Sequence, residues 1–166
     1  MKIAFLSLLL VAAPLAALAD SPDASFYKNA AEGGISEVDA GNLASTKGSS
    51  QAVKDFGTMM VKDHSAANDK LKSIASSKGV DLPTSASMSQ MATKAKLDVL
   101  SGDTFDKSYI KSQVKAHRET IALFKKEIAS GQDADAKAFA TSTLPTLRTH
   151  MKDITKIAAD AGVSTK

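Results

Sequence analysis

The chain of 166 residues has no cysteine and no tryptophan, and aromatic residues make up only 5% of it. Without cysteine there are no disulfides, no thiolate metal ligands and no cysteine nucleophile. The scarcity of aromatic rings argues against stacking surfaces that bind bases or sugars. Any chemistry in this chain must therefore come from other side chains.

The chain also lacks a concentration of charge of one sign. Its formal net charge is +3 and its pI is about 9.0, but the lysines are scattered among acidic residues. This pattern is typical of solvated helix faces and not of a basic surface that binds nucleic acid. We therefore expect no nucleic-acid partner.

Long apolar runs are absent except near the N-terminus. Lys2 precedes an almost unbroken apolar run over residues 3–15, and Ala17-Leu18-Ala19 forms an A-x-A cleavage site. This is the pattern of a secretory signal peptide. It predicts a cleaved leader over residues 1–19 and a mature single domain over residues 20–166. The mature chain has no run long enough to cross a membrane, so we expect an exported protein of the periplasm, free or associated with the outer membrane.

Hydrophobic periodicity predicts four long helices and one short one. Capping residues, glycines and prolines mark their ends and place them at about residues 22–47, 51–78, 88–97, 103–131 and 133–157. Pro145 falls inside the last helix and is expected to kink it. These elements predict an all-α fold.

The two halves of the chain are faintly similar to one another. A shift of 83 residues places Gly48 on Gly131 and Phe56 on Phe139 without a gap. This repeat predicts two helical hairpins of one design, joined by a long crossover that contains the short helix. The predicted architecture is a ferritin-like four-helix bundle.

Four ionisable residues lie on the inner faces of the four long helices: Glu37, His64, His117 and His150. They lie 12 and 15 residues on either side of the first hairpin turn, and 15 and 18 residues on either side of the second. Similar distances from a turn mean similar heights in an antiparallel hairpin. The four side chains are therefore predicted to meet in one layer near the middle of the bundle.

Such a layer has three interpretations. Three imidazoles and one carboxylate suit a divalent ion such as zinc, iron, manganese or copper, and Asp63 could be an acceptor behind a histidine or an extra ligand. A single ion is favoured, because the Glu-x-x-His pairs of di-iron bundles are missing. Alternatively, the layer is a metal-free hydrogen-bonded network in a structural or protein-interaction module of the cell envelope. No catalytic motif is recognised, which disfavours an enzyme. A redox or peroxide-handling enzyme is a third interpretation, and it would need an open coordination position on the metal.

Several runs in the chain resemble the bacterial family catalogued as domain of unknown function 4142. They are AAEGGISEVDAGNLASTK, VKDFGTMMVKDH, SGDTFDKSYI and TLPTLRTH, and they occur in order over residues 26–157. The resemblance implies a ferritin-like four-helix fold and a location in the periplasm or at the outer membrane. In that family the third helix usually carries Asp-His, whereas here Ala116 precedes His117. The resemblance implies no activity.

Overall fold

A computed structural model describes residues 22–165, which form five α-helices and no strand. The helices are α1 (Pro22–Lys47), α2 (Gln51–Ser77), α3 (Met88–Asp98), α4 (Gly102–Ser130) and α5 (Ala134–Asp160). The predicted all-α fold is confirmed, and each helix lies where the periodicity predicted it, with α4 beginning one residue earlier. The predicted signal peptide lies outside the described residues.

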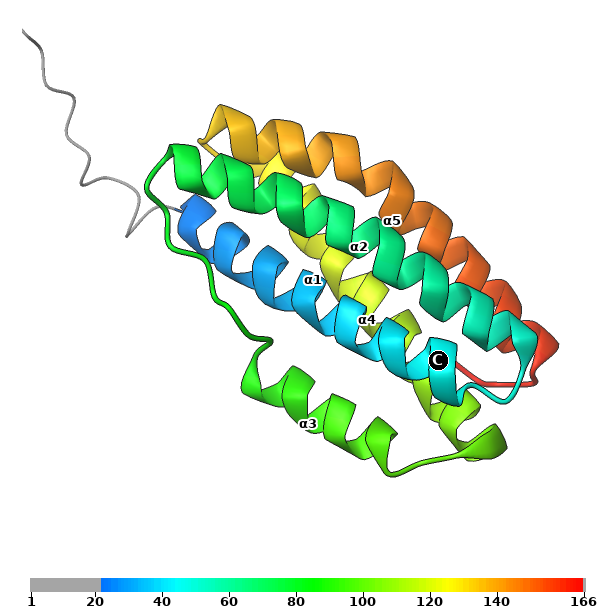
Figure 1. The fold of residues 1–166 in the computed structure, drawn as a ribbon. Helices are drawn as coiled ribbons and strands as arrows, with labels where there is room; N and C mark the ends of the chain where they lie inside the picture. The colour runs from blue at the N-terminus through cyan, green and yellow to red at the C-terminus, as the bar shows by residue number, and fades with distance from the viewer. Residues whose placement is uncertain (1–21, 166) are drawn as a thin grey trace, which may run out of the picture.

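The four long helices pack side by side along their lengths (Figure 1). Helix α1 packs on α2 and α4 packs on α5, while further contacts join α1 to α4 and α2 to α5. The short helix α3 lies in the connection between α2 and α4, on the outside of the bundle, against α1 and α4. The centre of the bundle is therefore lined by one face of each long helix.

The predicted repeat is visible in the way the two hairpins end. Gly79 and Gly162, 83 residues apart, both have a positive φ, of 67° and 63°. After each glycine a valine N–H donates back to a helix carbonyl: Val80 to Ala75 at 2.9 Å and Val163 to Ala158 at 2.8 Å. Glycine stops both helices in the same way because it adopts the left-handed conformation without steric cost.

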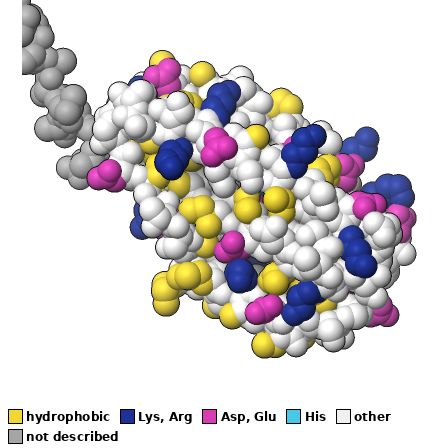
Figure 2. Space-filling view, viewed as in Figure 1, with side chains coloured by type: hydrophobic (Ala, Val, Ile, Leu, Met, Phe, Trp, Pro, Cys, Tyr) yellow, Lys and Arg dark blue, Asp and Glu magenta, His cyan; other side chains and the backbone are white. Residues whose placement is uncertain are grey.

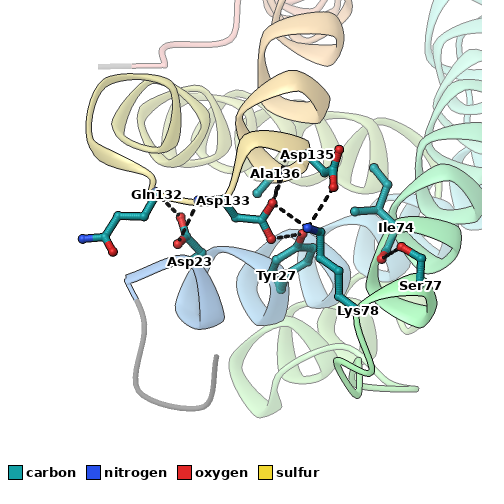
Figure 3. Close-up of polar contacts among 9 residues, drawn as sticks. All are labelled: Asp23, Tyr27, Ile74, Ser77, Lys78, Gln132, Asp133, Asp135 and Ala136. Atoms are coloured by element: carbon teal, nitrogen blue, oxygen red, sulfur yellow. Dashed lines mark hydrogen bonds and ion pairs between the residues drawn. The ribbon is translucent and has the colours of Figure 1, made fainter. Parts of the chain in front are cut away.

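The two hairpins also cap one another. The carboxylate of Asp106 in α4 accepts from the backbone N–H groups of Ser49 and Ser50, both at 2.8 Å, just before α2 begins. Its repeat equivalent, Asp23 in α1, accepts from Gln132 and Asp133 at 2.9 and 3.2 Å, just before α5 begins (Figure 3). Each hairpin thus supplies a buried carboxylate to N–H groups that would otherwise have no partner at the turn of the other hairpin.

Small residues let the first two helices approach closely. A Cβ atom on Gly41 of α1 would lie 2.8 Å from the carbonyl oxygen of Gly57 in α2, and one on Gly57 would lie 2.7 Å from the Cβ of Ala44. The small residues of α1 thus form part of its contact with α2.

Two apolar clusters fill the core. One includes Phe56, Tyr109 and Ile154, and the other includes Phe26 and Phe124. Along each long helix the polar positions of the predicted layer fall between the residues of these two clusters.

The visible surface in Figure 2 carries lysine, arginine and acidic side chains interspersed with one another, in agreement with the scattered charge of the sequence. Among the described helices, none has an apolar stretch sufficient to traverse a lipid bilayer.

Candidate metal centre

Three histidines from three different helices meet in the middle of the bundle. His64 belongs to α2, His117 to α4 and His150 to α5, and their exposed fractions are 7%, 1% and 1%. Their ring centroids lie 5.4–5.8 Å apart in all three pairs. One ring nitrogen of each residue lies within 4.8 Å of the other two, so this group could hold a metal ion. The predicted meeting of these three side chains is what the structure shows.

Two of the rings are oriented by hydrogen bonds on one side. His117 Nδ1 lies 3.0 Å from the backbone oxygen of Gln113, and His150 Nε2 lies 3.0 Å from Oδ2 of Asp63. Because both partners are acceptors, these nitrogens carry the hydrogen in the neutral rings. Asp63 is therefore an acceptor behind a histidine, one of the two roles predicted for it.

One nitrogen of each ring has no hydrogen-bond partner among the described residues. His64 Nε2, His117 Nε2 and His150 Nδ1 are buried and form no hydrogen bond with the described part of the chain. In His117 and His150 these are the nitrogens left with a lone pair. Buried polar atoms are nearly always paired, so three unpaired nitrogens in one layer require a reason, and a shared cation supplies one.

The surroundings of His64 and His150 favour the neutral form of these two rings. Burial, and then the nearby His117 and His150, lower the pKa of His64 to about 3. Burial also lowers the pKa of His150, although the hydrogen bond to Asp63 opposes this shift. Neutral imidazole is the form that binds a metal, so near pH 7 no proton must leave His64 or His150 before an ion binds.

An apolar ring closes one side of the group. The centroid of Phe56 lies 6.3 Å from that of His117 and 6.4 Å from that of His150, in edge-on arrangements. Phe56 thus restricts ring movement and excludes water from this side of the layer.

Glu37, the fourth residue predicted for the layer, lies beside the group and not within it. Its Oε1 is 3.9 Å from Nδ1 of His117, the nitrogen that faces Gln113. The residue is 5% exposed, and burial raises its pKa, while His117 and a side-chain hydrogen bond from Gln113 lower it. Its Oε2 has no hydrogen-bond partner among the described residues. The carboxylate is therefore placed to act on His117 from behind.

The distances can be compared with those of a real site. Zinc–nitrogen bonds of about 2.0–2.1 Å place the nitrogens of a tetrahedral site roughly 3.4 Å apart. The largest separation in this group is 4.8 Å. The nitrogens must therefore approach one another by roughly 1.4 Å at most to reach that geometry, which is within the range of small ring rotations. The three histidines fit one ion with room for a further ligand.

Sequence reasoning missed Gln113 and assigned Tyr109 no role in the site. Gln113 supplies the backbone acceptor for His117 and a side-chain contact to Glu37, and it is 3% exposed. Tyr109 is completely buried, its hydroxyl has no partner among the described residues, and burial and Glu37 raise its pKa well above normal. The four-residue spacing of Tyr109, Gln113 and His117 on one helix face is the signal that could have found both.

The fold has a counterpart among solved structures. The crystal structure of a DUF305 protein from Streptomyces coelicolor matches 89% of this chain and 98% of its own chain, with a TM-score of 0.75 and 14% sequence identity. At that identity the likeness concerns the fold alone. Among curated proteins, none matches this chain.

The family assignment comes from the sequence. The model of the domain of unknown function DUF4142 matches residues 10–157, which is most of the chain. The resemblance seen in the sequence runs is thereby confirmed. The chain belongs to the DUF4142 family.

Proposed function

We propose that this protein binds one divalent transition-metal ion through His64, His117 and His150. The observation that carries the proposal is the set of three buried ring nitrogens without partners, one from each of three helices. A hydrogen-bonded layer without metal would leave fewer of these nitrogens unpaired. Zinc, iron, manganese and copper all accept imidazole ligands.

Glu37 and Asp63 complete the proposed centre from outside the three ligands. A carboxylate or backbone carbonyl behind a ligating histidine fixes its tautomer and raises its basicity. Asp63 does this for His150 and the Gln113 carbonyl does it for His117, while the Glu37 charge offsets the charge that an ion would bring. Three protein ligands would leave a fourth position for water, or for Glu37 after a change of rotamer.

We also propose export and a ferritin-like arrangement of the helices. Export is supported by the apolar leader and its A-x-A site in residues 1–19, and the arrangement is supported by the packing of α1 on α2 and of α4 on α5. Intact-mass measurement of protein recovered from the periplasm checks the export proposal. A mature chain that begins at Asp20 is expected.

Elemental analysis combined with titration calorimetry tests the metal proposal. Wild-type protein, stripped with a chelator and reloaded, is expected to bind one equivalent of Zn²⁺ or Co²⁺. His64→Ala is expected to lower the affinity by at least about 100-fold, because it removes one of three ligands. Asp69→Ala is the matched control, since Asp69 is an exposed residue of the same helix and is not a ligand.

A metal-free structural or interaction module is the competing interpretation. It predicts substoichiometric metal in wild-type protein and no difference between His64→Ala and Asp69→Ala. That result would overturn the proposal. Circular dichroism of both variants shows whether a loss of binding reflects a loss of fold.

A further inference from the structure

The short helix α3 lies against α1 and α4 on the outside of the bundle (Figure 1). Residues of these three helices line an open cavity. Its volume is about 460 Å³. The floor includes Glu37 of α1 and Gln113 of α4, while Ser89, Gln90 and Thr93 of α3 belong to the opposite wall. The outside of the molecule therefore reaches to within one carboxylate side chain of His117.

A second, much smaller cavity lies on the other side of Glu37. Its volume is about 20 Å³, enough for about one water molecule. His64 lines it together with the polar side chains of Asn68 and Thr143. This cavity therefore adjoins one of the three histidines.

The two cavities share three lining residues: Gly33, Glu37 and Thr120. These residues separate the open cavity from the small one. Glu37 is 5% exposed and has one oxygen without a partner, so a carboxylate oxygen is available at this boundary. Gly33 has no side chain, and a Cβ atom placed on it would meet only Nε2 of Gln90, at 4.0 Å. The boundary is therefore thin at Gly33, and one helical turn further along α1 it carries the carboxylate of Glu37, which can bind a cation.

We propose that this pair of cavities is the route by which a divalent cation reaches the three histidines, and that Glu37 takes the ion from its water shell in the large cavity and passes it across the boundary. The inference rests on the proposed metal site. In this proposal the buried carboxylate of Glu37 binds the ion only during its passage and need not be a permanent ligand. A rotation of the Glu37 side chain opens the way from the large cavity to the small one.

The chemistry of the lining defines the class of ion. The small cavity is lined mainly by apolar side chains, among them Leu71, Phe124 and Phe139, and no methionine lines either cavity. The large cavity, by contrast, is lined by hydroxyl, amide and carboxylate oxygens. Such oxygens suit a hydrated divalent ion, whereas copper(I) prefers sulfur ligands. Two lysines, Lys94 and Lys115, line the large cavity beside three glutamates, and Lys115 pairs with one of these, Glu119, at 3.5 Å. The route therefore favours Zn²⁺, Mn²⁺ or Fe²⁺ over Cu⁺.

Stopped-flow loading with Co²⁺ tests the route, because Co²⁺ bound to imidazole absorbs visible light. Gly33→Leu places a side chain at the boundary without touching a histidine, and replacing glycine inside a helix does not lower helix propensity. It is expected to slow both association and chelator-driven release of Co²⁺ by about tenfold or more, with an unchanged dissociation constant. Gly33→Ala is the matched control and is expected to load at the wild-type rate.

A second substitution, on another helix, tests whether slow loading in Gly33→Leu comes from a filled boundary or from an indirect effect on α1. Thr120→Leu on α4 fills the same boundary and is expected to slow loading as well, while the isosteric Thr120→Val is not. Glu37→Gln is expected to slow loading although it leaves the boundary the same size. Wild-type rates in both leucine variants, with the wild-type dissociation constant, would overturn the route and leave the metal site standing. Absence of Co²⁺ binding by wild-type protein would instead overturn the metal site itself.

Discussion

At the scale of single residues, the proposed centre depends on which nitrogen of each ring carries the hydrogen. His150 presents Nδ1 to the group because Nε2 is held at 3.0 Å by Asp63, a side chain at the edge of the bundle with 30% of its side chain exposed. Asp63 precedes His64 directly, so a single stretch of α2 supplies one ligand and orients another. A change at Asp63 therefore acts on His150 without removing any ligand.

We expect Asp63→Asn to weaken metal binding by about 10- to 100-fold, because the amide can also donate and no longer fixes the Nε2–H tautomer. Titration calorimetry with Zn²⁺ measures the change. Asp69→Asn is the matched control, since Asp69 is an exposed aspartate on the same helix. Equal losses in both variants would mean that surface charge and not ring orientation is responsible.

The positions of the histidines were predictable from sequence, but their tautomers were not. His64, His117 and His150 recur in register with apolar residues at helical spacing, and this fixes the face that they occupy. Ring orientation depends on neighbours from other helices, such as Asp63 for His150, and no periodicity in one helix carries that information. For the same reason the sequence could not show that Glu37 lies near Nδ1 of His117, the ring nitrogen that points away from the other two histidines.

At the scale of secondary-structure elements, the reciprocal caps at the helix starts join the two hairpins. Asp106 accepts two backbone N–H groups ahead of α2, and Asp23 accepts two ahead of α5. Both aspartates are almost fully buried, with exposed fractions of 7% and 1%. The shift of 83 residues aligned these positions, but only the structure shows that each aspartate caps the opposite hairpin and not its own.

We expect Asp106→Ala to lower the free energy of unfolding by about 2–4 kcal/mol, because it leaves two buried N–H groups without partners. Urea denaturation followed by circular dichroism measures the change. Asp69 is exposed and forms no ion pair or hydrogen bond with the described residues, so Asp69→Ala is expected to alter stability by less than about 0.5 kcal/mol. A loss in Asp106→Ala no larger than in this control would show that water replaces the carboxylate at the turn.

At the scale of the whole molecule, a metal in the core would couple the two hairpins through ligands drawn from α2, α4 and α5. The helices and their ends followed from hydrophobic periodicity and from capping residues, glycines and prolines, which is why they were predictable. The cavity beneath α3 was not, because it depends on how far a short helix with exposed Met88 and Met91 stands from the bundle.

We expect Zn²⁺ at about 100 times its dissociation constant to stabilise the wild-type protein by about 2.7 kcal/mol, since a ligand of the folded state alone shifts the unfolding equilibrium. Thermal unfolding with and without the ion measures the shift. The His64→Ala variant serves as the control and is expected to melt at one temperature in both conditions. An equal rise in both proteins would indicate binding at the surface.

The stability of the metal-free protein should also depend on pH through Glu127. This residue is 5% exposed, and burial, and then the neighbouring Asp23 and Asp133, raise its pKa from 4.5 to about 7. Between those two values the folded protein holds a proton that the unfolded chain releases, so the contribution is complete below pH 4.5 and is lost as the pH rises through 7.

Urea unfolding of wild-type protein and of Glu127→Gln at pH 5 and pH 8 measures this effect. Between these pH values the wild-type protein should lose about 1–3 kcal/mol relative to the variant, which cannot ionise at this position. Glu119→Gln, a change at an exposed glutamate, is the matched control and should follow the wild-type profile. His64 acts in the opposite direction at lower pH, because its pKa of about 3 makes protonation of the folded state costly below pH 6.5. The effect of His64 is the same in the wild-type protein and in both variants. If the loss of stability between pH 5 and pH 8 is unchanged in Glu127→Gln, its origin lies in a group other than Glu127.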